Sequence, residues 1–451
     1  MLKRAADKNL GEIARTLIRF CLPLILSGIL QQLYNWVDAF IVGNVEGELA
    51  LAAIGATTMI SQFFVMAITG FTVGLAIFFA QKFGAGQLED IPRILATFTL
   101  LLGAVFLVLA VAGFQLAAPV LHLMHTTADT VALAEAYLSV IFIGLPFLAV
   151  YNTYAAALRG IGDSRAPFLA IFASSLTNVV LDILFVAVLH WSVRGAAVAT
   201  VFSQAAMTVF IVIYGIKKHP PLRFQLQTSC FDCRMLRQGA ALGVPPMIQS
   251  TVIASGNLIL QNFMNGFQTQ TVAAITTAYR IDSIVLQPVV NNGSGISTLV
   301  AQSKGAGDEM RALRILQVGT GIMAAVCLLT TVTIIPAGSY LIAMFGAGPE
   351  AVEIGRNFFQ RIAAFYIVYG LATSVRGYLE GMGDVVYSSL AGIFSLGARI
   401  LFSYTLVRFY GNMVIAYAEA YSWGILLTLY LVRFFWRRRK VRKAAEISGQ
   451  A

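Results

Sequence analysis

The chain contains an internal repeat, which limits its fold to two equivalent halves. The segment AQKFGAG at 80–86 recurs as AQSKGAG at 301–307, and RGIGD at 159–163 recurs at the same offset as EGMGD at 380–384. Separated motifs that share one offset indicate a duplicated structural unit rather than chance. Two equivalent halves predict a two-lobed molecule with a working site between the lobes.

The composition places both halves in a membrane. Hydrophobic residues make up 58% of the chain and charged residues only 12%, whereas a typical soluble protein has about 25% charged residues. Because lipid cannot satisfy backbone hydrogen bonds, apolar segments of roughly 20 residues must cross it as helices, and the alternating pattern of a β-barrel is absent. We predict an all-α integral membrane protein with about twelve transmembrane helices in two six-helix bundles. The predicted spans are 15–42, 49–80, 92–118, 131–157, 165–189, 195–216, 237–264, 271–302, 312–336, 351–379, 385–408 and 412–435.

The distribution of Lys and Arg predicts the topology. With the N-terminus in the cytoplasm, most of the 31 basic residues fall on cytoplasmic segments, including Lys217, Lys218 and the tail from Arg437 to Lys443. This bias predicts a multi-pass protein of the cell (inner or plasma) membrane with both termini cytoplasmic. It also accounts for the net charge of +10, so nucleic-acid binding is not needed to explain that charge. An even number of spans in each half makes the repeats parallel, related by an axis along the membrane normal.

The longest polar interruption divides the halves. The predicted domains are an N-lobe at 1–216, a cytoplasmic linker at 217–236, and a C-lobe at 237–451 that ends in the basic tail. Within the linker, Cys230 and Cys233 have the spacing of a zinc or redox pair. No second Cys or His pair lies nearby, so neither role is assigned.

Two acids lie inside apolar segments of the first half and are missing from the second. Asp38 aligns with Leu260 (or with Ile259 in the adjacent register), and Asp182 aligns with Ser403. A charge at membrane depth costs about 2.5–3.5 kcal/mol on insertion scales, so each acid requires a reason to be there.

Each of these acids has a polar neighbour one helical turn away. Asp38 shares a helix face with Tyr34, and Asp182 shares one with Asn178, because residues four apart are neighbours on a helix. A carboxylate beside an amide offers oxygen ligands to a small cation, and a buried carboxyl can also take up and release a proton. The alternatives are an acid that touches water near an outer helix end and a polar pair that joins helices. We favour a functional role for both acids.

The second half carries a different set of charges. Arg280 and Asp282 are two residues apart and do not face each other, whereas Arg376 and Glu380 are four apart and could pair. These four residues either form structural ion pairs or line a substrate cavity. Two further ionisable residues lie deeper in their segments, and the sequence does not indicate their partners: Arg399 and Glu419.

A set of short segments occurs in a characteristic order along nearly the whole chain. They are 23–25 with 38–43, then 52–55, 80–86, 159–163, 178–182, 195–200, 279–283 and 380–384. This ordered set resembles the MATE (multidrug and toxic compound extrusion) family, in its prokaryotic type. The resemblance implies a V-shaped, two-lobed fold with a central cavity, and antiport of organic cations or amphipathic compounds against H⁺ or Na⁺.

The resemblance also implies site residues. The family's cation site in the first lobe maps onto Asp38, Asn178, Asp182 and Thr200, where this sequence has the expected residue types. No metal is implied beyond Na⁺ at Asp38, Asn178 and Asp182. One branch of the family has a glutamate in the seventh helix, but the corresponding segment 249–257 contains no carboxylate, which favours coupling through the first lobe alone. The expected auxiliary or substrate-cavity residues are Tyr34, Arg280, Asp282, Arg376 and Glu380.

We therefore expect a secondary active multidrug efflux antiporter that is coupled to H⁺ or Na⁺ through the acids of the first half and needs no other cofactor. Its expected partners are small organic cations or amphipathic drugs and the lipid bilayer, and the chain is expected to act as a monomer. An enzyme is not expected, because no metal-ligand cluster or nucleophile–base pair stands out. The alternative is a flippase for a lipid-linked anionic precursor, whose pyrophosphate Arg280, Arg376 and Arg399 could hold. The acids of the first half and the lack of two extra helices seen in one flippase branch count against it.

Overall fold

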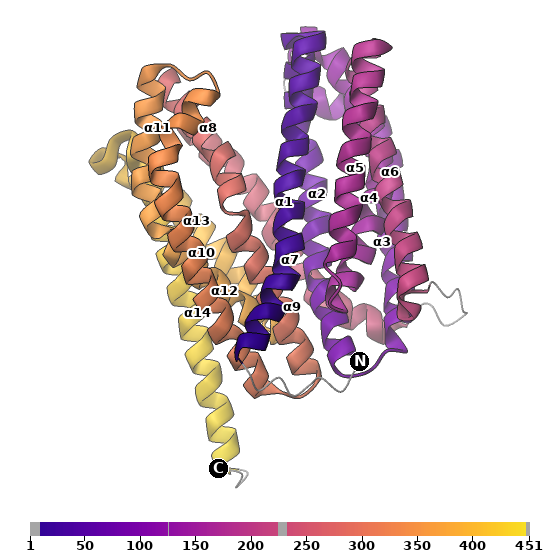
Figure 1. Ribbon diagram of the computed structural model, residues 1–451. Helices are drawn as coiled ribbons and strands as arrows, with labels where there is room; N and C mark the ends of the chain where they lie inside the picture. Colours follow the sequence, from indigo (N-terminus) through magenta and orange to yellow (C-terminus); the bar gives the residue numbers. More distant parts are fainter. Residues whose placement is uncertain (1–9, 125, 224–231, 448–451) are drawn as a thin grey trace. The chain divides into compact units, whose positions relative to one another are not determined.

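The computed structural model describes residues 10–124, 126–223 and 232–447, and the regular elements in these ranges are helices (Figure 1). The predicted all-α fold is confirmed. The helices of the first half are α1 (Leu10–Glu46), α2 (Glu48–Gly84), α3 (Asp90–Leu123), α4 (Ala128–Gly160), α5 (Arg165–Asp182), the π-helical η2 (Ile183–Val188), α6 (Ser192–Lys218) and the short η3 (Pro220–Leu222).

The second half repeats this series of long helices with more interruptions. Its helices are α7 (Cys233–Met264), α8 (Thr269–Val285), α9 (Gln287–Gly305), α10 (Glu309–Met344), α11 (Pro349–Ile362), η4 (Ala363–Phe365), α12 (Tyr366–Gly381), α13 (Val385–Tyr410), η5 (Gly411–Met413) and α14 (Val414–Ile447). Part of the predicted linker, residues 224–231, lies outside the described residues, and Cys230 is in this part.

Each predicted span falls on one of these helical passes. Nine segments of the described chain are long and apolar enough to cross a membrane, and the last of them, Val385–Lys440, covers both α13 and α14. The two remaining predicted spans are α7 and the pair α8 and α9, which are more polar. The second of these is divided at Leu286, because Pro288 cannot continue the hydrogen-bond ladder of α8.

The chain forms two compact units, each built from more than one half of the repeat. The N-unit is Leu22–Thr251, and the C-unit combines the start of the chain up to Cys21 with Val252–Ala451. These units differ from the predicted lobes, 1–216 and 237–451, because the first turns of α1 and the first half of α7 each belong to the opposite unit.

Packing at the start of α1 explains its place in the C-unit. The side chain of Leu17 is fully buried, and it lies near Gly319 of α10. The Cys21 thiol donates to the side-chain oxygen of Asn292 in α9, with 3.6 Å between sulfur and oxygen. These contacts hold the first turns of α1 against α9 and α10.

The first half of α7 packs on α2 of the N-unit through glycines. A Cβ added to Gly74 would stand 2.0 Å from the carbonyl oxygen of Leu242, and one added to Gly70 would stand 2.6 Å from that of Pro246. The two backbones therefore approach so closely that only glycine fits at these positions of α2.

The repeated glycine motifs end equivalent helices in the same way. Gly86 and Gly307 have φ angles of 73° and 74°, and Gly162 and Gly383 have φ angles of 94° and 82°. Residues other than glycine rarely adopt such positive values. The motifs that repeat in the sequence therefore form turns of the same geometry in the two halves.

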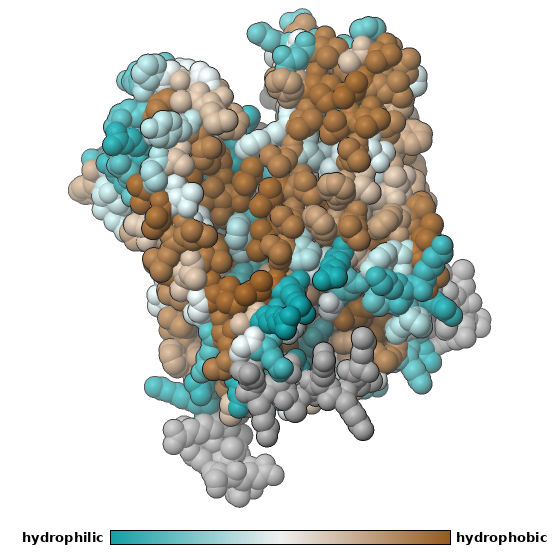
Figure 2. All heavy atoms as spheres, viewed as in Figure 1, coloured by the Kyte–Doolittle hydropathy of each residue, from teal (hydrophilic) through white to brown (hydrophobic). Residues whose placement is uncertain are grey.

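The lateral surface of both units is apolar. Figure 2 shows hydrophobic residues over most of the visible side of each unit and hydrophilic residues gathered toward the helix ends. Large apolar side chains in the middle of long helices are exposed, such as Val108 of α3 (68% exposed) and Leu329 of α10 (70%). Apolar surface of this extent on a helical bundle is the surface that contacts lipid.

Candidate functional site

The acids of the first half converge inside the N-unit. Asp38 lies on α1 and is 8% exposed, whereas Asp182, the last residue of α5, is fully buried. Asn178, one turn before Asp182, is also fully buried, and Thr200 of α6 is 6% exposed. These four buried polar side chains therefore come from three helices, α1, α5 and α6.

The two carboxyls form a pair. Asp38 and Asp182 lie within hydrogen-bonding reach of each other. Two ionised carboxylates have no proton to donate. In that form one oxygen of Asp38 and both oxygens of Asp182 have no hydrogen-bond partner within the described part of the chain. Like charges this close repel strongly in a medium of low dielectric constant, so a shared proton or a bound cation stabilises the pair.

Neutral polar groups next to the pair are also without partners. The side-chain oxygen and nitrogen of Asn178 and the hydroxyl oxygen of Thr200 are buried and make no hydrogen bond to any other described residue. Buried polar groups are normally satisfied, and exceptions in a native fold call for an explanation. Carboxylate, amide and hydroxyl oxygens are the ligand types that suit a small, hard cation.

Two tyrosines complete the surroundings of the pair. Tyr34, one turn before Asp38 on α1, lies close to Thr200 and to both acids. Tyr137 of α4 is 8% exposed and lies near Asp38, Asp182 and Tyr34. Tyr137 is not predictable from the sequence pattern, because helical spacing relates residues within one helix and does not indicate which residues α4 turns toward α1.

A local irregularity positions Asp182. The chain leaves regular α-helical geometry directly after this residue and forms the π-helical turn Ile183–Val188. The wider turn is closed by the backbone N–H of Leu189, which donates to the carbonyl of Leu184 at 2.9 Å. The ring of Phe185 stacks on Trp191 with 4.9 Å between centroids. Single π turns of this kind occur frequently at functional sites.

The buried acids of the C-unit each have a partner. Glu419 pairs with Arg399 at 2.9 Å, and Glu380 pairs with Arg376 at 2.6 Å. Asp282 accepts a hydrogen bond from the Tyr366 hydroxyl. Arg376 and Glu380, which lie four residues apart on α12, therefore do form a pair. Arg399 and Glu419, whose partners the sequence does not indicate, pair with each other between α13 and α14.

Further polar groups surround these C-unit pairs. Arg399 also donates to the Tyr279 hydroxyl at 2.8 Å, and Ser388 donates to Glu380 at 3.0 Å. Arg280 is exposed on α8, and no acid of the described chain lies within ion-pair distance of it. The predicted auxiliary residues are therefore divided between a site in the N-unit, which includes Tyr34, and separate pairs in the C-unit.

Comparison with known proteins relates this arrangement to one family. The MatE family model matches residues 23–184 and 245–405, which cover both halves of the repeat. The chain belongs to the MatE family. The family resemblance noted in the sequence is confirmed, and the chain is a multi-pass membrane protein of a transporter family.

MatE relatives match along most of their length. A probable multidrug resistance protein YpnP of Bacillus subtilis (strain 168) is 28% identical over 85% of this chain and 86% of its own. A second protein of that strain, the probable multidrug resistance protein YoeA, is 26% identical over 97% of both chains. The solved outward-facing conformation of a multidrug resistance MATE family transporter is similar with a TM-score of 0.88. That match has 19% identity and covers 98% of this chain and 99% of that one.

Proposed function

We propose that the protein is a secondary active exporter of organic cations or amphipathic drugs, driven by H⁺ or Na⁺ entering through the N-unit. The observation that supports this proposal is the difference between the buried acids of the two units. Asp38 and Asp182 face each other without a cationic partner among the described residues, whereas the acids of the C-unit are compensated by arginine or tyrosine.

The carboxyl pair acts as the coupling group in this proposal. Loading one H⁺ or Na⁺ lowers the charge of the pair and stabilises the conformation that buries it. Release of the ion restores the repulsion between Asp38 and Asp182 and favours a conformation in which the pair is hydrated. A ligand shifts a conformational equilibrium only through its different affinity for the two states, and an unpaired buried carboxyl pair gives a cation such a difference.

The drug-export part of the proposal rests on the relatives. The two Bacillus subtilis proteins that match over most of this chain are named as probable multidrug resistance proteins. A transporter rather than an enzyme is the corresponding proposal for this chain. The positive-inside bias of the sequence supports a cytoplasmic location for both termini in this proposal.

The flippase alternative is weakened by the C-unit pairs. Of the three arginines considered for a pyrophosphate group, Arg376 and Arg399 are already bound to carboxylates, at 2.6 Å and 2.9 Å. Only Arg280 remains without an acidic partner among the described residues. A single exposed guanidinium is a poor site for a multiply charged anion, since such sites normally combine several cationic groups.

The test is transport of a fluorescent organic cation in proteoliposomes with a pH gradient and a Na⁺ gradient imposed separately. One of the two gradients is expected to drive accumulation by the wild type, and Asp38→Asn is expected to abolish the driven component. Asp90→Asn is the matched control, because Asp90 pairs with Lys82 outside the candidate site. Driven transport by Asp38→Asn at the wild-type rate would overturn the proposed coupling.

A further inference from the structure

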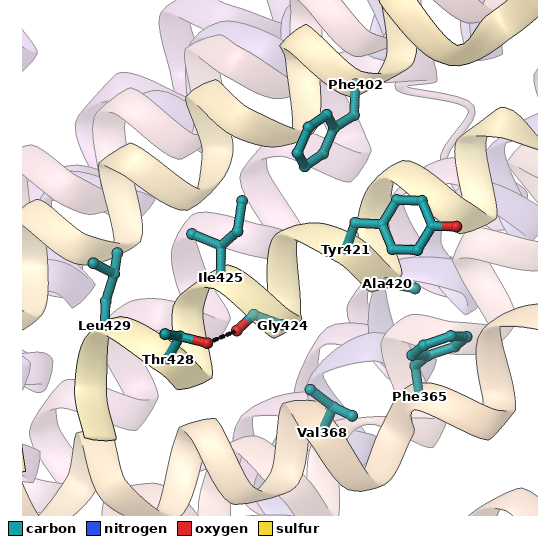
Figure 3. Close-up of a pocket in the computed structure, with 9 residues that line it drawn as sticks. All are labelled: Phe365, Val368, Phe402, Ala420, Tyr421, Gly424, Ile425, Thr428 and Leu429. Atoms are coloured by element: carbon teal, nitrogen blue, oxygen red, sulfur yellow. Dashed lines mark hydrogen bonds between the residues drawn. The ribbon is translucent and has the colours of Figure 1, made fainter. Parts of the chain in front are cut away.

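An apolar cavity lies between the last three helices of the C-unit. It has a volume of about 430 Å³, within the roughly 300–1,000 Å³ range of ligand pockets. Figure 3 shows Phe402 of α13 on one side and Phe365 on the other, with Tyr421, Gly424 and Ile425 of α14 between them. The cavity therefore has aromatic walls and a floor formed by α14.

The two side-chain hydroxyls at the cavity already have hydrogen-bond partners within the protein. The Thr428 hydroxyl donates to the carbonyl oxygen of Gly424 at 2.8 Å, the bond drawn in Figure 3. The Tyr421 hydroxyl lies 2.9 Å from that of Tyr410. Both hydroxyls already have a partner in the protein, and the rest of the lining is apolar, so the cavity is suited to an apolar group, such as a hydrocarbon chain.

The same face of α14 continues beyond the cavity as an exposed apolar stripe. Tyr421, Ile425 and Thr428 follow helical spacing, and the next positions on this face are Val432 and Trp436. Val432 is 60% exposed and Trp436 is 51% exposed. Tryptophan is enriched where a helix leaves the hydrocarbon region and meets lipid headgroups.

The stripe ends at basic residues. Arg438, Arg439 and Lys440 are exposed, and the Lys440 ammonium lies 5.2 Å from the centroid of the Trp436 ring. With a rise of 1.5 Å per residue, Gly424 and Trp436 are roughly 18 Å apart along the helix axis. This distance is comparable to one leaflet of the hydrocarbon core, which is about 30 Å thick in total.

We propose that this groove binds an anionic phospholipid, with one acyl chain in the cavity at Gly424 and the phosphate at Arg439 and Lys440. The hydrocarbon chain fits the satisfied, aromatic-walled cavity, and the headgroup fits the cationic end of the same helix face. An ammonium near a membrane surface is attracted to anionic lipid, which selects this lipid class over a zwitterionic one.

A second apolar cavity, in the N-unit, shows why the proposal depends on basic residues at the end of the groove. It lies among α2, α3 and α4 and includes Phe64, Leu116 and Phe142. The end of α3 beside it, from Leu116 to Met124, has no Lys or Arg. By the same argument that cavity has no cationic group from this helix end for an anionic headgroup, so of these two cavities the one at α14 is expected to prefer anionic lipid.

Native mass spectrometry of the detergent-solubilised full chain, with phosphatidylglycerol or phosphatidylcholine added, tests the proposal. The wild type is expected to retain one phosphatidylglycerol in preference to phosphatidylcholine. Gly424→Leu places a side chain at the floor of the cavity, where its Cβ would meet no atom within 4 Å, and it is expected to lose the retained lipid. Gly321→Leu on α10, equally free of contacts, is the matched control and is expected to retain it.

The headgroup contact is tested by Arg439→Gln combined with Lys440→Gln. The retention of phosphatidylglycerol relative to phosphatidylcholine is expected to fall by about thirty-fold, because phosphatidylcholine has no net charge and loses less when the two bases are removed. Equal retention of the two lipids by the wild type, or retention of phosphatidylglycerol by Gly424→Leu at the wild-type level, would overturn the proposal.

Discussion

The α-carbon of Gly74 in α2 faces the backbone of α7 so closely that an added Cβ would stand 2.0 Å from the carbonyl oxygen of Leu242. Neither backbone can yield as a flexible side chain could. Gly74→Ala is therefore expected to destabilise the N-unit by about 3 kcal/mol or more, since forcing atoms into a packed site is costly. Thermal unfolding in detergent measures the effect. Gly55→Ala is the control on the same helix, because a Cβ there meets nothing within 4 Å, and an equal loss in both variants would contradict the explanation.

The carboxyl pair of the N-unit is expected to lower the free energy of unfolding. Asp182 is fully buried and neither of its oxygens has a hydrogen-bond partner among the described residues. Asp182→Asn removes a charge from this site and is expected to raise the unfolding free energy at alkaline pH by about 1 kcal/mol or more, while driven transport is lost. Thermal unfolding and proteoliposome transport are measured on the same preparations. A less stable variant would indicate that the carboxyl has a structural role.

The ion pair of the C-unit is expected to behave in the opposite way. Glu419 and Arg399 lie 2.9 Å apart, with side chains 10% and 17% exposed. Glu419→Gln leaves the guanidinium buried without its carboxylate, which is expected to cost about 3–5 kcal/mol. Replacing both partners, by Arg399→Met with Glu419→Gln, is expected to cost less than the single change. Thermal unfolding of both variants and of Arg399→Met completes a double-mutant cycle, and purely additive losses would show that the pair is not coupled.

One carboxyl in the turn between α4 and α5 is expected to make stability depend on pH. Burial opposes ionisation of Asp163. His219 Nε2 at 2.8 Å and the backbone N–H groups of Ala166 and Arg165 outweigh it, so the pKa of Asp163 lies below its usual value of 3.8. Because the folded pKa is depressed, this stabilisation is fully present above the unfolded pKa and is lost as the pH falls through the folded one.

Asp163→Asn measures this contribution. The variant is expected to melt at a lower temperature than the wild type at about pH 6, and the two melting temperatures are expected to converge toward about pH 3. Asp129→Asn, at an exposed position in the first turn of α4, is the control. A difference for Asp163→Asn that stays constant over this range would mean that the ionisation of Asp163 does not stabilise the fold.

The features predicted correctly from the sequence depend on local chemistry. Long apolar segments must form helices in lipid, so the positions of the spans follow from the residues themselves. The pair Arg376 and Glu380 was considered because both lie on one helix, four residues apart. The turns at Gly86 and Gly307 have matching positive φ angles because both copies of the motif retain the glycine.

The features that were missed depend on contacts between distant segments. Tyr137 joins the surroundings of Asp38 through the packing of α4, and Arg399 meets Glu419 across two helices. Periodicity within one helix contains no information about either contact. The compact units likewise depend on a contact between distant segments, the close approach of Gly74 to α7, which no local pattern indicates.

The passage of α1 and α7 from one unit to the other has a consequence for engineering the chain. Each copy of the duplication now completes its fold with helical turns that the other copy encodes. Expressed alone, a half that ends at Lys218 would lack the part of α7 that covers Gly70 and Gly74. The two halves are therefore expected to accumulate only when they are produced together, because each depends on helical turns from the other for its packing.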